Sequence, residues 1–209
     1  MSKGLMAMRL LFNDASPYAR KCAVVAHEKG LADQVEIDRI MIYEREIRDK
    51  NPLNKIPCLI LDDDTGLFDS FVICDYLDRI GTGPKLIPAD GEARTRVLRT
   101  HAIGQGLTDA ALILRTQVMR DAKLDTPLPK DWYIERQWDA IKASCKTVDK
   151  EIASLHGDID LGQISIATGL GYLDLRFPDS AWRQHAPKLA DWYTEFVKRP
   201  SMQATAPQG

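Results

Sequence analysis

The sequence has 209 residues, of which 44% are hydrophobic and 28% are charged, close to the average for globular proteins. This length suits one large domain or two small ones, and such a chain can bury a core without disulfides or metals. The formal net charge is −2 and no basic stripe is present. These features argue against a nucleic-acid partner and favour small ligands or protein partners.

The cysteines and histidines give no sign of a structural bridge or a metal centre. The four cysteines form no CxxC pair, so we expect free thiols at Cys22, Cys58, Cys74 and Cys145. The four histidines show no metal-ligand spacing, and no metal is expected. No signal-peptide core opens the sequence, and no run approaches the roughly 20 apolar residues that span a bilayer. We therefore expect a cytoplasmic protein without a membrane partner.

The first part of the chain alternates strands and helices. Residues 8–12 form a short apolar run ended by Asn13 and Asp14, which predicts a buried strand. Ser16 suits an N-cap and Pro17 the first helical position, so a helix is predicted over 18–29, with Gly30 after its end. Alternating apolar and charged residues over 35–40 predict a second strand.

The next segments complete a small α/β unit. Residues 43–50 are highly charged and predict a short exposed helical segment. An apolar strand over 56–61, a turn over 62–66 and a short strand over 67–68 predict a hairpin. Ser70 is predicted to cap a helix over 71–80 that ends at Gly81. The order is βαβ followed by ββα.

The remainder of the chain is predicted to be all helical. Residues 84–91, rich in Gly and Pro, predict a linker. A long helix is predicted over 92–120, although Gly104 and Gly106 each weaken it by about 1 kcal/mol relative to Ala. Pro127 and Pro129 are expected to break the chain before a second helix over 132–155, whose apolar positions follow three- and four-residue steps.

A capping box is predicted before the most apolar helix. Asp160 is the expected N-cap, and the Gln163 side chain is expected to reach back to the Asp160 backbone N–H. Ile159 and Ile164 form a hydrophobic staple around the cap. The helix over 163–175 is apolar or small on all sides, which predicts a central position, and a last helix is predicted over 188–198. The predicted domains are 1–83 (α/β), 84–91 (linker) and 92–209 (all-α helical bundle).

Three motifs occur in order: Ser-Pro-Tyr-Ala-Arg-Lys at 16–21, Asn-Pro-Leu-Asn-Lys-Ile-Pro at 51–57, and Asp-Ser at 69–70. Together they resemble the thioredoxin-like N-terminal domain of the glutathione S-transferase superfamily. The capped apolar helix ending at 171–177 resembles the C-terminal domain of that superfamily, so the likeness covers nearly the whole chain. Residues 106–110 (Gly-Leu-Thr-Asp-Ala) point to its bacterial, cytosolic, YibF-like branch.

The resemblance implies a glutathione site. Pro57 would follow a cis peptide bond, and the backbone of Ile56 would pair with the cysteinyl part of glutathione as a strand pairs with a sheet edge. Ser70, at a helix N-terminus, would bind the γ-glutamyl carboxylate, and Asp69 the α-amino group. Lys55 would bind the glycine carboxylate. The alternatives are a trans proline at an edge strand, plain helix capping and a solvated lysine.

Ser16 is the candidate catalytic residue. The thiolate of glutathione is the nucleophile, and a free thiol with a pKa of about 8.5 is mostly protonated at neutral pH. A hydroxyl that donates a hydrogen bond to the sulfur lowers that pKa. Plain capping is the alternative for Ser16, and Tyr18 is the rival donor. No cysteine stands at position 16, which argues against the disulfide-forming classes of the superfamily.

The second substrate is expected between the domains, against the helix over 92–120. Tyr18, Gln105 and Asp109 are the candidate pocket residues, although core networking or surface exposure explains Gln105 and Asp109 equally well. The superfamily usually forms homodimers, and a dimer interface is an alternative use for the charged residues Arg94, Arg96, Arg99 and Asp75 or Asp78.

The expected function is a glutathione transferase of the detoxifying kind. Glutathione is the co-substrate, and its sulfur attacks a small electrophile that the sequence does not name. Dehalogenation, lyase or isomerase chemistry would use the same thiolate. The alternative is a non-catalytic binding or regulatory protein that keeps the fold, since a fold alone does not fix function. A glutathione-dependent reductase ranks last.

Overall fold

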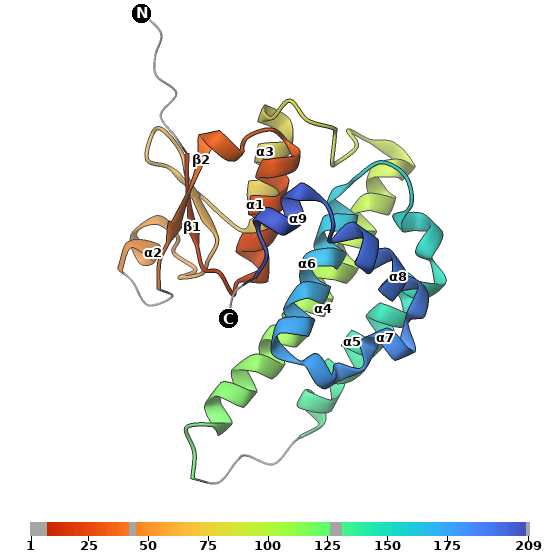
Figure 1. Ribbon diagram of the computed structural model, residues 1–209. Helices are drawn as coiled ribbons and strands as arrows, with labels where there is room; N and C mark the ends of the chain where they lie inside the picture. Colours follow the sequence, from red (N-terminus) through yellow and green to blue (C-terminus); the bar gives the residue numbers. More distant parts are fainter. Residues whose placement is uncertain (1–7, 42–44, 126–130, 208–209) are drawn as a thin grey trace, which may run out of the picture.

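The structure is a computed structural model that describes residues 8–41, 45–125 and 131–207 (Figure 1). The predicted breaks at Pro127 and Pro129, the start of the segment predicted over 43–50, and the first seven residues lie outside this range. In the described part of the chain, no helix is both long and apolar enough to cross a membrane.

A four-stranded mixed sheet forms the first layer. Its strands are β1 (Met8–Phe12), β2 (Val35–Arg39), β3 (Cys58–Ile60) and β4 (Gly66–Leu67), in the order β2-β1-β3-β4. Strands β1 and β2 are parallel, and the other two pairs are antiparallel. This arrangement confirms the predicted βαβ-ββα order. Strand β3 is shorter than predicted, because Pro57 has no N–H for the ladder and Leu61 turns back to bond Thr65.

Helices cover both faces of the sheet (Figure 1). Helices α1 (Pro17–Glu28) and α3 (Ser70–Ile80) pack on one face as part of the main core. On the other face, Ile47 of α2 (Arg45–Lys50) joins a smaller core with side chains of β1 and β3. A 3₁₀ turn, η1 (Ala32–Gln34), precedes β2. The N-cap of α3 is Asp69 rather than Ser70, because the Asp69 side chain accepts from the Phe71 N–H.

The rest of the described chain is helical. The predicted helix over 132–155 ends at Lys150, where a separate 3₁₀ turn follows, and two short helices over 182–185 and 200–204 were not predicted. The elements are α4 (Gly91–Asp121), α5 (Trp132–Lys150), η2 (Ile152–Leu155), α6 (Leu161–Arg176), η3 (Pro178–Ser180), α7 (Trp182–His185), α8 (Pro187–Phe196) and α9 (Pro200–Ala204).

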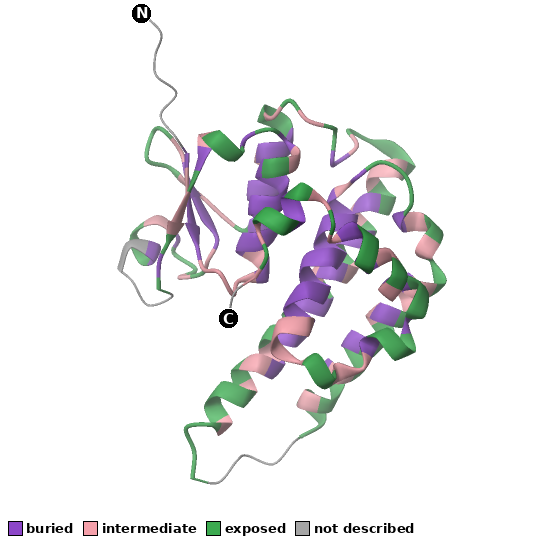
Figure 2. Cartoon of the chain, in the orientation of Figure 1, coloured by how far each residue is buried: buried purple, intermediate pink, exposed green. Residues whose placement is uncertain are grey.

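Helix α6 lies at the centre of the helical region, as predicted. Every residue from Leu161 to Leu173 is buried (Figure 2). Asp160 Oδ1 accepts from the Gln163 N–H at 2.9 Å, which confirms the predicted cap. The other half of the predicted box is wrong, because Gln163 Nε2 donates to the Asp158 carbonyl at 3.0 Å instead of engaging the Asp160 backbone.

Glycines set the close packing of α4 against α6. A Cβ on Gly104 would lie 2.6 Å from the Ile166 nitrogen, and one on Gly169 would lie 2.8 Å from Thr108 Oγ1. Contacts advance in the same direction along both helices, so α4 and α6 run parallel. The unfavourable helix propensity of Gly104 is therefore outweighed by a backbone approach that no side chain would allow.

Two glycines in α4 provide a matched test of this packing. Gly104→Ala is expected to destabilise the protein by about 1–3 kcal/mol, because the added methyl meets the backbone of α6. Gly106→Ala, with nothing within 4 Å of the added Cβ, is expected to stabilise it by about 0.5–1 kcal/mol. Urea unfolding would measure both. Equal stability of the two variants would contradict the packing account.

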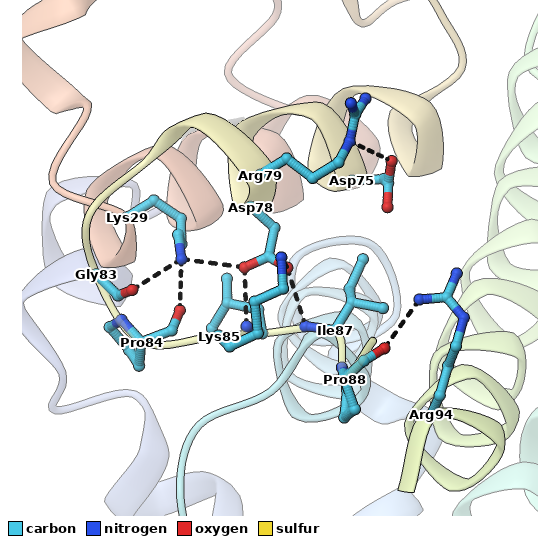
Figure 3. Close-up of polar contacts among 11 residues, drawn as sticks. Lys29, Asp75, Asp78, Arg79, Gly83, Pro84, Lys85, Ile87, Pro88 and Arg94 are labelled. Atoms are coloured by element: carbon cyan, nitrogen blue, oxygen red, sulfur yellow. Dashed lines mark hydrogen bonds and ion pairs between the residues drawn. The ribbon is translucent and has the colours of Figure 1, made fainter. Parts of the chain in front are cut away.

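A buried ion pair holds the segment between α3 and α4 (Figure 3). Lys29 Nζ lies 3.1 Å from Asp78 Oδ1, and both side chains are at most 2% exposed. Lys29 also donates to the carbonyls of Gly83 and Pro84, while Asp78 accepts from the N–H groups of Leu86 and Ile87. Both carboxylate oxygens of Asp78 are therefore bonded within the chain, which rules out the role at a dimer interface that the sequence allowed.

Asp78→Asn is expected to destabilise the protein by about 3 kcal/mol, because it leaves the Lys29 ammonium buried without its counter-charge. Asp75→Asn is the matched control on the same helix. Asp75 pairs with Arg79 at 3.0 Å, and both of these side chains are partly exposed, so its loss is expected to cost less than about 0.5 kcal/mol. Equal shifts of the melting temperature in the two variants would show that the buried ion pair contributes no more to stability than the exposed one.

Candidate active site

Ser16 caps helix α1, which follows the central strand β1. Its Oγ accepts from the Ala19 N–H at 3.3 Å, and its side chain is half-buried. A hydroxyl has one donor and two acceptor sites, so the proton of Ser16 remains available to a further acceptor. The position also lies at the positive end of the α1 dipole, which favours a negative charge beside it.

Tyr18 is held in a hydrogen-bonded network with α4. Its hydroxyl donates to Asp109 Oδ1 at 2.6 Å, and Gln105 Nε2 donates to the same oxygen at 3.1 Å. Burial, followed by the hydrogen bond to Asp109, raises the pKa of Tyr18 well above its ordinary value. The phenol thus stays protonated and its single proton is already bound, which leaves none for a ligand.

Lys21 and His101 extend this network, and neither was predicted. Lys21 Nζ donates to Gln105 Oε1 at 2.8 Å and lies 3.2 Å from His101 Nε2. Burial, and then the Lys21 charge, lower the pKa of His101 to about 4. The imidazole is therefore neutral near pH 7 and can accept from the ammonium of Lys21, which is only 2% exposed.

The N-terminus of α3 adjoins this network. The Phe71 ring contacts the His101 ring with centroids 5.0 Å apart. Asp69 is exposed and caps the Phe71 N–H at 3.0 Å, while Ser70 is buried and its carbonyl accepts from Cys22 Sγ at 3.5 Å. The backbone N–H of Ser70, at the first position of α3, has no acceptor within the helix and lies at the positive end of the helix dipole.

The loop before β3 is shaped by Asn51. Its Nδ2 donates to the Lys55 carbonyl at 2.7 Å, and its Oδ1 accepts from the Leu53 N–H at 2.9 Å. The Ile56–Pro57 peptide bond is cis. Ile56 lies outside the ladder, whose first paired residue on this strand is Cys58. The Lys55 side chain is exposed.

The structure brings the predicted pocket residues Tyr18, Gln105 and Asp109 into one network and places it beside the Asp69–Ser70 turn. Lys55 stays apart from this network. Lys21 and His101 were missed, although one sequence signal was available: 101, 105 and 109 are spaced by four and so share one face of a helix.

The cysteines are not candidate nucleophiles. All four are buried, and burial raises the pKa of Cys58 to about 11 and that of Cys145 to about 12. Within the described ranges, no group of three or more potential ligands is arranged to hold a metal ion.

Comparisons with known proteins identify the family of this chain. Residues 15–80 match the family model for the glutathione S-transferase N-terminal domain. A glutathione transferase family member from Pseudomonas fluorescens Pf-5, solved with bound glutathione, is 40% identical over 97% of this chain and 100% of that one, with a TM-score of 0.90. A second structure from that strain holds S-(propanoic acid)-glutathione and is 41% identical over 96% of this chain and 100% of that one, with a TM-score of 0.84.

A curated relative extends the comparison. The uncharacterized GST-like protein YibF of Escherichia coli K12 is 27% identical over 96% of this chain and 98% of its own length. The chain therefore belongs to the glutathione transferase superfamily, as its sequence motifs predicted. Its small mixed sheet followed by a large helical region is the thioredoxin-like plus helical architecture found in these structures.

The neutral state of His101 gives a pH-dependence of stability. The pKa of His101 is about 4 in the fold and 6.5 for an unperturbed histidine, so the unfolded chain binds the extra proton between these values. The contribution of His101 to the free energy of unfolding is thus fully present above about pH 6.5. It falls by up to about 3 kcal/mol as the pH drops towards 4. Urea unfolding of wild type and His101→Gln over this range should give a steeper decline for wild type. Parallel curves would show that His101 titrates normally.

Proposed function

We propose that this protein is a glutathione transferase that activates the thiol of glutathione with the hydroxyl of Ser16. The observation that carries the proposal is the contrast between Ser16 and Tyr18. The Tyr18 proton is bound to Asp109 at 2.6 Å, whereas Ser16 accepts from the Ala19 N–H and keeps its proton. A thiolate beside Ser16 would receive that hydrogen bond and the favourable end of the α1 dipole, and both lower the thiol pKa.

Glutathione would lie along the edge between the 51–57 loop and the start of α3. The Ile56 backbone, outside the ladder, would pair with the cysteinyl part. The γ-glutamyl carboxylate would accept from the N–H and hydroxyl of Ser70 at the α3 N-terminus. Asp69 uses one oxygen for its cap, which leaves the other for the α-amino group, and the exposed Lys55 would reach the glycine carboxylate.

The second substrate would lie near the α1 N-terminus, beside the network of Tyr18, Gln105 and Asp109. The sulfur of glutathione forms a bond to an electrophilic carbon, and either a leaving group departs or a double bond takes up a proton. One relative holds S-(propanoic acid)-glutathione, and we propose that the second-substrate site of this protein also accepts a carboxylate on that substituent. The domain limits 1–83, 84–91 and 92–209, a cytoplasmic location and a detoxifying role belong to the same proposal.

We further propose that the protein is a homodimer. Leu53, in the loop before β3, and Val72 and Ile80, on α3, are exposed at 56%, 44% and 43%. A second copy would remove this apolar surface from water.

Ser16→Ala is expected to lower kcat by about 10- to 100-fold with glutathione and an activated aryl chloride, the range expected for one lost hydrogen bond to a charged group. Glutathione affinity, measured by calorimetry, is expected to change by less than about threefold. Tyr18→Phe is the control and should keep most of the activity, because its hydroxyl serves Asp109.

The reverse result, with kcat lost only in Tyr18→Phe, would reassign the donor. Unchanged kcat in Ser16→Ala would remove Ser16 from the mechanism. Glutathione binding by wild type without turnover of any electrophile would identify a binding protein instead of an enzyme.

A further inference from the structure

Two arginines stand at matching positions near the far end of the α4–α6 contact. The helices run parallel, with Thr108 against Gly169. Seven residues, or about two turns, beyond this contact on both helices stand Arg115 and Arg176. The Arg176 guanidinium carbon lies 5.9 Å from the centre of the Tyr172 ring. Burial raises the pKa of Tyr172, and the charges of Arg176 and Arg115 oppose that rise, in keeping with two cations beside one hydroxyl.

Neither cation has an acidic partner in the described part of the chain. The carboxylates along these helices are engaged elsewhere: Asp109 accepts from Tyr18 and Gln105, Asp121 from Gln117, and Asp174 from Trp182 and Arg183. Arg176 Nε is buried and has no hydrogen-bond partner. Two adjacent guanidinium groups without a counter-charge repel each other, and a buried N–H without an acceptor costs free energy. An anion placed between them would remove both penalties.

Tyr18 links these arginines to the catalytic end of α1. Its hydroxyl is bonded to Asp109 of α4, and it also lies near enough to Tyr172 of α6 for the two phenols to influence each other electrostatically. Ser16 caps the same helix two residues earlier. In Figure 1, α4 continues past the C-terminal end of α6. A group that extends from a sulfur at Ser16 past Tyr18 towards the C-terminal end of α6 would therefore approach Arg115 and Arg176.

We propose that Arg115 and Arg176, with the hydroxyl of Tyr172, form an anion subsite for a carboxylate on the substituent that glutathione sulfur acquires. This inference rests on the proposed function and deepens it, because it names the substrate class as carboxylate-bearing electrophiles. Guanidinium groups match the planar carboxylate, and charge-assisted hydrogen bonds are about twice as strong as neutral ones. In the reaction, the sulfur–carbon bond forms and a halide leaves, or the electron pair of a conjugated double bond takes a proton from water.

Calorimetry with three ligands tests the subsite: glutathione, S-(2-carboxyethyl)glutathione, and S-(2-carbamoylethyl)glutathione, in which a neutral amide replaces the carboxylate. Wild type is expected to bind the carboxylate conjugate about tenfold more tightly than the amide conjugate. Arg115→Gln and Arg176→Gln should each lose most of that preference while keeping the affinity for glutathione. Arg120→Gln, an exposed arginine further along α4, is the matched control and should keep the preference.

The outcomes separate the two proposals. If wild type does not bind glutathione, the proposed function itself is wrong. If it binds glutathione but does not distinguish the two conjugates, or if the glutamine variants keep the preference, the subsite is wrong and the transferase proposal stands. If Arg176→Gln does not fold, Arg176→Lys, which keeps the charge, and Arg115→Gln on the half-buried face of α4 decide the question.

Discussion

The burial of cationic side chains on helix α1 is the constraint on which the rest of the structure depends. The helix lies between the sheet and the helical region. Arg20 and Lys21 in its first half are buried, and so is Lys29, which forms its C-cap. A buried charge is costly unless it is paired or hydrogen-bonded. The groups that bond these cations come from distant parts of the chain: the Met202 carbonyl of α9, Gln105 and His101 of α4, and Asp78 with the carbonyls of Gly83 and Pro84. Arg20 keeps two buried nitrogens, Nε and Nη1, without a hydrogen-bond partner. The same contacts fix α4, α9 and the linker relative to α1, and so fix where Ser16 stands.

The proposed chemistry follows from how the protons are distributed along this interface. Tyr18 donates a hydrogen bond to Asp109, and the neutral His101 can accept one from Lys21. Glutathione carries a net negative charge, and the N-terminal ends of α1 and α3 both favour it. Ser16 is left as a hydroxyl with a proton to donate. Polar groups that look like alternative catalysts thus serve to hold the helices together and to leave one donor free.

The sequence predicted most of the fold because the signals were local. Ser16-Pro17 and Asp160 marked helix starts through capping chemistry, and the two-residue period of β2 was visible in the chain. What it could not show depends on contacts between distant residues. Gly104 looked like a weak point in a helix, and only the approach of α6 explains it. The burial of Lys21 and Lys29 has no local signal in the sequence, because their partners at 105, 101 and 78 come together only in the fold. The same holds for Arg115 and Arg176, which are adjacent only because α4 and α6 are parallel.

The central claim is that the hydroxyl at the start of α1 lowers the pKa of bound glutathione. Ultraviolet difference absorbance of the thiolate, followed against pH with glutathione saturating the wild-type protein, tests it most directly. The account predicts a bound thiol pKa at least about one unit below the value of about 8.5 for a free thiol, with a thiolate signal already present near pH 7. A bound thiol that titrates at its free value would contradict the account, whatever the affinity for glutathione.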